Sequence, residues 1–123
     1  MKEIIAIIRP KQMNSTKKAL DELGLPSITA TQVLGRGKQR GIAGEINVDL
    51  RPEEIDQAKY RTMPYIPKRM VTVVVPDKDA DNVVETLVRI NRTGQVGDGR
   101  IFVCPVDDAL RVRTDEYGEK AIL

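Results

Sequence analysis

Histidine and tryptophan are absent from the 123-residue chain, and its aromatic residues are one phenylalanine and three tyrosines. Without an imidazole the chain cannot form a Ser-His-Asp triad or a His-based zinc site. The single cysteine, Cys104, has no partner for an intramolecular disulfide and cannot complete a Cys-rich zinc site alone, a usage typical of a reducing cytoplasm. These absences favour a protein that works by binding.

Long apolar runs and a large net charge are also missing. No run approaches the ~18 residues that span a bilayer, and Met1 to Ile5 lack the pattern of a secretory signal peptide. Twenty basic and eighteen acidic residues leave a net charge of +2, which does not indicate a nucleic-acid or membrane partner. The sequence therefore predicts a cytoplasmic protein with one domain, residues 1–123.

Apolar periodicity gives the same order of elements twice. Residues 2–9 hold an almost unbroken apolar run that closes at Pro10, and a similar run at 71–75 closes at Pro76. The predicted elements are strands over 2–9, 28–35, 71–75 and 100–104, and helices over 14–23 and around 80–88. Two βαβ units in tandem predict an α+β fold, a ferredoxin-like double βαβ sandwich with both helices on one face.

Two segments fit neither pattern. Residues 38–67, the long loop, are punctuated by three prolines, and loops beyond ~15 residues are uncommon in compact domains unless they are functional or disordered. A tolerated surface insertion is the alternative. The tail, about 114–123, has charge and no periodicity, so we expect it to be mobile or docked on a partner subunit.

Glycines stand beside basic residues at two places, Gly35 to Gly41 after a predicted strand and Gly97 to Arg100 before one. Glycines allow positive φ and close approach of backbone N–H groups to an anion, and Lys or Arg adds charge-assisted hydrogen bonds to phosphate. Neither cluster is a P-loop or a GxGxxG motif, and each alone is more often a plain turn.

Arg111-Val112-Arg113 is a third basic element. Strand alternation would place Arg111 and Arg113 on one side, where a pair of guanidinium groups suits a polyphosphate. The alternative is a solvated edge strand whose charges block aggregation.

Together these elements resemble the PII signal-transduction proteins of nitrogen regulation. The resemblance rests on Thr93-Gly94-Gln95-Val96-Gly97-Asp98-Gly99-Arg100-Ile101-Phe102-Val103, on Arg111 to Thr114, on the opening Met1 to Pro10, and on Gly35 to Gly41. It covers nearly the whole chain outside residues 42–65. PII proteins are ferredoxin-like trimers that bind ATP or ADP in clefts between subunits, so the resemblance implies the same here.

The resemblance also implies roles for individual residues. The phosphates would be wrapped by Gly97, Asp98, Gly99 and Arg100. Arg111 and Arg113 would reach across from the neighbouring subunit. The adenine, ribose and phosphate side of the cleft would be lined by Ile7, Thr29, Gly35, Gly37, Lys38 and Val74.

The family senses 2-oxoglutarate as well, chelated to a Mg²⁺ that the ATP phosphates hold. Gln39 matches the family's metal-contacting glutamine, and Lys68 matches the lysine that pairs with a 2-oxoglutarate carboxylate. Gly41 would let loop N–H groups approach the effector. Mg²⁺ accepts hard oxygen ligands and usually relies on substrate phosphates, so this set is chemically coherent.

The chain departs from the usual family pattern in its long loop. The Tyr-Arg-Gly-Ala-type sequence that carries a uridylylated tyrosine is missing, since Tyr60 and Tyr65 stand in other contexts. The greater loop length, with residues 65–70 and 104–108, resembles the second of two PII-like proteins encoded with nitrogenase. Asp115 also replaces a glycine that is common after the Arg-x-Arg-Thr segment.

The resemblance therefore implies a regulator, not an enzyme, that inhibits nitrogenase by binding dinitrogenase and is relieved by 2-oxoglutarate. It leaves open a homotrimer or a mixed assembly with a sister PII-like protein. The rival within the family is a regulator of an ammonium transporter. Outside it, an RNA-binding ferredoxin-like module would need two or three stacking aromatics, and Phe102 is the one strand aromatic. An enzyme using Asp98 or Glu45 would need a nucleophile–base pair, which is not readable.

Overall fold

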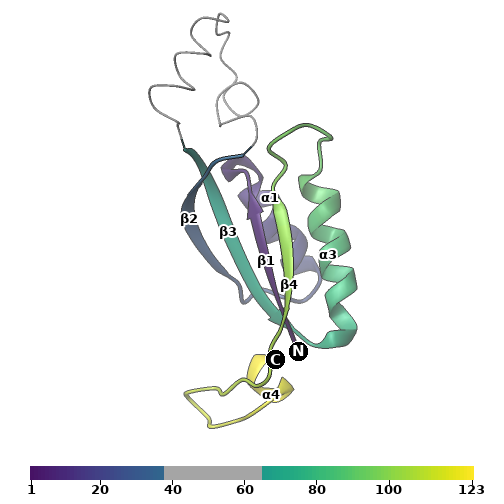
Figure 1. The fold of residues 1–123 in the computed structure, drawn as a ribbon. Coiled ribbons are helices and arrows are strands. Elements are labelled where there is room, and N and C mark those ends of the chain that lie inside the picture. Colours follow the sequence, from purple (N-terminus) through teal and green to yellow (C-terminus); the bar gives the residue numbers. More distant parts are fainter. Residues whose placement is uncertain (38–64) are drawn as a thin grey trace, which may run out of the picture.

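The structure is a computed structural model, and it describes residues 1–37 and 65–123. Four strands, two long helices and two short helical segments follow one another along these residues (Figure 1). In chain order they are β1 (Lys2–Ile8), η1 (Pro10–Gln12), α1 (Met13–Glu22), β2 (Thr29–Gly35), β3 (Ile66–Val75), α3 (Asp77–Asn91), β4 (Arg100–Pro105) and α4 (Glu119–Ile122). Each predicted strand and helix is present with its bounds shifted by a few residues.

The strands form one antiparallel sheet in the order β2-β3-β1-β4. Each βαβ unit is split, because β3 lies between β1 and β2, and β1 lies between β3 and β4. Helices α1 and α3 both lie on the same face of the sheet (Figure 1). The predicted ferredoxin-like double βαβ fold is therefore confirmed.

The core lies between this face and the two helices. Alternate residues of β1 and β3 point into it, and the i, i+3, i+7 positions of α3 meet them. The fully buried apolar residues include Ile4, Ile8, Leu20, Val71, Val75, Val83 and Leu87. Burial of one such side chain stabilises the fold by about 1.5–3 kcal/mol. The predicted helical stripes therefore supply the core.

The opposite face of the sheet has no described element over it (Figure 1). The register pairs Ile5 with Phe102 and Ile7 with Met70, and directly opposed side chains share a face. These residues are only partly buried or exposed. The sheet therefore leaves one face, the open face, without a cover among the described residues, and these four apolar side chains lie on it.

β3 begins five residues earlier than the predicted strand over 71–75, and its first two residues, Ile66 and Pro67, belong to the strand and not to the long loop. Pro67 lies opposite Leu34 of β2, while β1 ends where Ile8 meets Arg69. The missing N–H of a proline therefore interrupts no ladder on the β1 side. The rest of the predicted loop, 38–64, lies outside the described residues.

The C-terminal segment folds back on itself where strand alternation was expected over residues 111–113. Leu110 bridges Tyr117, and the N–H of Gly118 donates to the carbonyl of Ala109 at 3.0 Å. The N–H of Asp115 donates to the carbonyl of Arg111, which closes a turn where we predicted strand alternation. The strand prediction was wrong because these backbone groups pair locally, and no neighbouring strand of the described sheet receives them.

Candidate functional site

A cleft of about 440 Å³ opens at the end of the sheet where β1 and β2 finish and β3 and β4 begin. Seven of the predicted site residues line it: Ile7, Gly35, Gly37, Lys68, Gly97, Gly99 and Arg100. Four others were not predicted: Arg36, Ile66, Val96 and Phe102. Antiparallel pairing brings these four strand ends together, so segments far apart in the sequence share one wall.

The segment 93–99, the glycine turn, forms one side of the cleft. Its centre is the carboxylate of Asp98, which accepts hydrogen bonds from the N–H groups of Thr93 and Gly94 at 2.8 and 2.9 Å and from the Thr93 hydroxyl at 2.5 Å. Arg9 adds an ion pair at 2.7 Å. Burial by itself would raise the pKa of the Asp98 carboxyl, but these donors together lower that pKa well below its ordinary value.

Gly99 must be glycine in this arrangement. Its φ is +103°, and a Cβ at this position would lie 1.8 Å from the carbonyl oxygen of Ile7. The turn therefore packs backbone against backbone on β1, next to the cleft. Gly97 also has a positive φ, of 101°. The predicted need for glycine here thus has a direct steric cause.

Arg9 was missed as a site residue. It is 8% exposed, and its guanidinium donates to Asp98 Oδ1 and to the carbonyl of Val96, at 2.7 and 3.0 Å. The sequence signal for Arg9 was its position, a charged residue directly after the apolar run Ile4 to Ile8. The run predicted a core strand, and no role in the site was predicted for Arg9.

Lys68 and Arg100 supply positive charge to the cleft. Lys68 is 7% exposed, and its Nζ donates to the carbonyl of Gly97 at 2.8 Å. Arg100 is exposed and pairs with Ile7 on the open face of the sheet. Because the Asp98 charge is compensated by Arg9, the described part of the cleft is positive and suits an anion.

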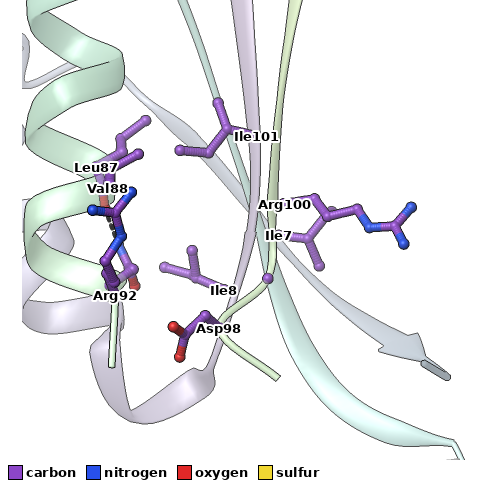
Figure 2. A pocket seen from close by; sticks show the side chains of 10 residues that line it. Ile7, Ile8, Leu87, Val88, Arg92, Asp98, Arg100 and Ile101 are labelled. Carbon is purple, nitrogen blue, oxygen red and sulfur yellow. Dashed lines mark hydrogen bonds between the residues drawn. The ribbon is translucent and has the colours of Figure 1, made fainter. Parts of the chain in front are cut away.

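A smaller hollow of about 160 Å³ lies behind the glycine turn, against the end of α3. In Figure 2 Ile8 and Ile101 point toward α3, while Ile7 and Arg100 point to the other side of the sheet. The Oδ1 atom of Asn91, which lines this hollow, is buried without a hydrogen-bond partner. Ile7, Gly99 and Arg100 line both the hollow and the cleft, so the two cavities adjoin at the end of the glycine turn.

Of the predicted residues that the structure describes, five do not line this cleft within one chain: Thr29, Val74, Asp98, Arg111 and Arg113. Thr29 and Val74 lie on the open face, opposite Thr72 and Glu3. Arg111 and Arg113 follow β4, at the far end of the sheet from the glycine turn (Figure 1). Lys38, Gln39 and Gly41 lie outside the described residues.

Arg111 is engaged within its own segment. Its guanidinium pairs with Glu116 Oε1 at 3.0 Å and donates to the carbonyls of Lys120, at 2.9 Å, and Leu123. Arg113 is exposed. Strand alternation predicted that Arg111 and Arg113 lie on one side. In the turn, Arg111 pairs with Glu116, while Arg113 is exposed.

Arg36, which lines the cleft, follows the last residue of β2, and Tyr65 precedes the first residue of β3. The guanidinium carbon of Arg36 lies 5.8 Å from the centre of the Tyr65 ring, within the range of a cation–π contact. No helix of the described residues is long and apolar enough to cross a membrane.

A ferredoxin-like sheet, with one face that no described element covers and a cationic, glycine-lined cleft at its end, defines a small α+β protein whose cleft suits an anion in charge. Sequence comparison identifies the family: the sequence profile described as nitrogen regulatory protein P-II matches residues 1–116. The chain belongs to the P-II family, whose members are regulatory proteins of nitrogen metabolism. The family resemblance inferred from the glycine and arginine motifs is confirmed.

Individual relatives narrow the likeness. The chain is 58% identical, over the whole of both chains, to nitrogen fixation nifHD region GlnB-like protein 2 of Methanobacterium ivanovii. It is 54% identical to the protein of that name from Methanothermobacter marburgensis, over 99% of this chain and 100% of the relative. GlnB-like protein 1 of the same organism is 42% identical over 96% and 99%. The likeness to the second protein of the pair therefore exceeds the likeness to the first.

Proposed function

We propose that the protein senses ATP or ADP together with 2-oxoglutarate and inhibits nitrogenase by binding dinitrogenase when 2-oxoglutarate is low. The observation that carries this proposal is the cleft, because it gathers Gly35, Lys68, Gly97, Gly99 and Arg100 from three separate segments. The names of the relatives, which refer to a nifHD region, support the link with nitrogen fixation.

ATP or ADP fits the described chemistry of the cleft. Backbone groups at two positive-φ glycines approach a ligand closely, and Arg100 and Lys68 offset the charge of a polyphosphate. Lys38 would add a further cation. An apolar side, formed by Ile7, Ile66 and Phe102, suits a base or ribose face.

A neighbouring subunit would complete the site. The open face needs a cover, and Arg113 lies beyond the far end of β4, so it reaches such a cleft only from another copy. We propose a trimer on this basis. Relatives named GlnB-like proteins 1 and 2 both exist in one organism, so the trimer consists of one chain type or of this chain with a sister protein.

The effector site would combine Mg²⁺, 2-oxoglutarate, Gln39, Gly41 and Lys68. Within residues 1–37 and 65–123 no three carboxylate or thiol side chains cluster as metal ligands, which fits a Mg²⁺ held mainly by phosphate and effector oxygens. When bound, Mg²⁺ would neutralise phosphate charge and chelate the 2-oxo acid. Lys68, already at the cleft wall, would pair with the distal carboxylate.

Regulation follows if ATP with 2-oxoglutarate favours one arrangement of the long loop, and ADP or ATP alone another. A coupling free energy of about 1–3 kcal/mol changes partner affinity roughly 5- to 150-fold. Dinitrogenase would then bind only the effector-free arrangement.

Calorimetry tests the ligand part. We expect Lys68→Ala to abolish 2-oxoglutarate binding while ATP still binds, and Lys78→Ala, an exposed lysine on α3, to change neither. Retained 2-oxoglutarate affinity in Lys68→Ala would remove Lys68 from the effector site. A wild-type protein that binds no ATP would overturn the proposed function.

A pull-down from extract of nitrogen-fixing cells tests the partner. Recovery of dinitrogenase without 2-oxoglutarate, and its loss when MgATP and 2-oxoglutarate are added, is the expected result. Recovery of an ammonium transporter instead would favour the rival target.

A further inference from the structure

Arg9 and Lys68 are the buried charged residues of the described part of the chain. Both are directed at the glycine turn. Lys68 donates to the carbonyl of Gly97, while Arg9 donates to Val96 and Asp98 on either side of it. Three consecutive residues of the turn are therefore each held by a cation.

The two bonds of Arg9 come from one planar group. Nη1 meets Asp98 Oδ1 at 2.7 Å and Nη2 meets the carbonyl of Val96 at 3.0 Å. A guanidinium holds two acceptors in a fixed relation, which an ammonium group cannot do. Gly97 lies between these two acceptors, so the backbone is fixed on both sides of it. The path of the chain from Gly97 to Gly99 is fixed in the same way.

We propose that Arg9 is a positioning residue for nucleotide binding: by holding Val96 and Asp98 it fixes the backbone of Gly97 to Gly99 at the cleft wall. This inference rests on the proposed function. Arg9 is not among the residues that line the cleft, so it acts through the turn and not by touching the ligand.

Arg9 also acts electrostatically, because its charge compensates that of Asp98. The glycine turn carries a carboxylate, that of Asp98, in a segment proposed to face phosphates. A bare carboxylate there would repel a polyphosphate, and leaving it partly buried without its cation is costly. The Arg9 ion pair compensates this charge from the protein side, so the turn presents backbone groups and not a negative charge.

Lys68 has two proposed tasks, to hold the carbonyl of Gly97 and to pair with 2-oxoglutarate, and Arg9 keeps the turn in place when Lys68 performs the second. If Lys68 turns to a 2-oxoglutarate carboxylate, its bond to Gly97 is weakened or lost. The turn then remains held at Val96 and Asp98 by Arg9. Nucleotide therefore stays bound while the effector enters.

The test compares Arg9→Met, Arg9→Lys and the control Lys11→Met in the full-length protein, with ATP affinity from calorimetry and the amide resonances of Gly97 and Gly99 from NMR. Lys11 is exposed on η1, two residues from Arg9, and its replacement removes the same charge. Loss of a charged hydrogen-bond pair weakens binding by about tenfold or more, which we expect for Arg9→Met.

Both glycine resonances should shift in Arg9→Met without ATP, and Arg9→Lys should recover part of the affinity because it keeps the charge but not the fork. Lys11→Met should match wild type. An ATP Kd for Arg9→Met within twofold of wild type, or an equal loss in Lys11→Met, would overturn the inference while leaving nucleotide binding intact. Failure of the wild type to bind ATP would instead overturn the proposed function.

If Arg9→Met does not fold, Arg9→Lys and Asp98→Asn decide the question. Both should weaken ATP binding and shift the same two glycine resonances, because Arg9→Lys loses the two-pronged geometry of the guanidinium and Asp98→Asn loses the charge that pairs with it. Folded variants with wild-type affinity and wild-type glycine resonances would contradict the role of Arg9.

Discussion

Two turns of this chain are proposed to contact phosphate, and they are built in opposite ways. In the glycine turn, one carboxylate, Asp98, collects N–H and hydroxyl donors and the Arg9 guanidinium. In the C-terminal turn, residues 111–118, one guanidinium, Arg111, collects a carboxylate and two carbonyls. The first turn is organised around an anion and the second around a cation.

The difference concerns what holds each turn in place and which groups it leaves for the proposed phosphate ligand. The glycine turn is held from outside by Arg9, which follows β1, and by Lys68 of β3, and its Gly97 and Gly99 line the cleft. The C-terminal turn is held by its own Arg111, which leaves Arg113 exposed beside it. In the proposed site the glycine turn would contribute a fixed surface and the C-terminal turn an exposed cation, Arg113.

The largest loss of ATP affinity is expected from Gly99→Ala, which disrupts the packing of the glycine turn on β1. Its Cβ would collide with the carbonyl of Ile7, so the turn must move away from β1. We expect ATP affinity to fall about 100-fold or more, measured by calorimetry, because the displaced backbone loses its contacts with phosphate.

Gly94→Ala is the matched control, since Gly94 has a φ of +85° but nothing near a Cβ. It should cost only about 1 kcal/mol of stability and leave ATP affinity close to wild type. Equal losses in the two variants would mean that backbone strain, and not the approach to Ile7, sets the affinity.

The fold was largely predictable because its core depends on local periodicity. The runs around Ile4 and Val73 and the stripe through Val83 and Leu87 are readable without tertiary information. The cleft glycines were predictable for the same reason, since their motif is continuous in sequence.

Tertiary pairing was not predictable in this way. The bonds from Arg9 to Asp98 join residues 89 positions apart, and no local pattern marks them. The C-terminal turn was misread as a strand because an Arg-x-Arg alternation resembles an edge strand. Asp115, noted for replacing a glycine, adopts a φ of 60°, where glycine is favoured and aspartate is tolerated.

A second, intermediate loss of ATP affinity should come from Arg113→Ala, which removes the exposed cation of the C-terminal turn. Loss of a guanidinium–phosphate pair weakens binding by roughly 10- to 100-fold, and calorimetry with ATP measures it. Stability should be unchanged, because Arg113 is exposed. An unchanged ATP Kd would count against the assignment of Arg113 to the cleft.

Mixed assemblies show whether Arg113 acts from a neighbouring subunit. Chains with Gly99→Ala keep Arg113, and chains with Arg113→Ala keep an intact glycine turn. Co-expression should therefore regenerate wild-type sites where an intact turn meets an intact arginine, with the ATP affinity of those sites restored. If the two variants never complement each other, the arginine does not act in trans.

The smallest effect is expected from Glu116→Gln, which loosens the hold of the C-terminal turn on Arg111. The pair is 3.0 Å long and both side chains are partly exposed, so it contributes at most about 1 kcal/mol. If Arg111 must leave Glu116 to meet a phosphate, the variant should bind ATP about two- to fivefold more tightly. Glu119→Gln removes the same charge from an exposed position on α4 and should change affinity less. Equal gains in both variants would mean that general charge, and not release of Arg111, determines the affinity, and the C-terminal turn would then contribute Arg113 alone.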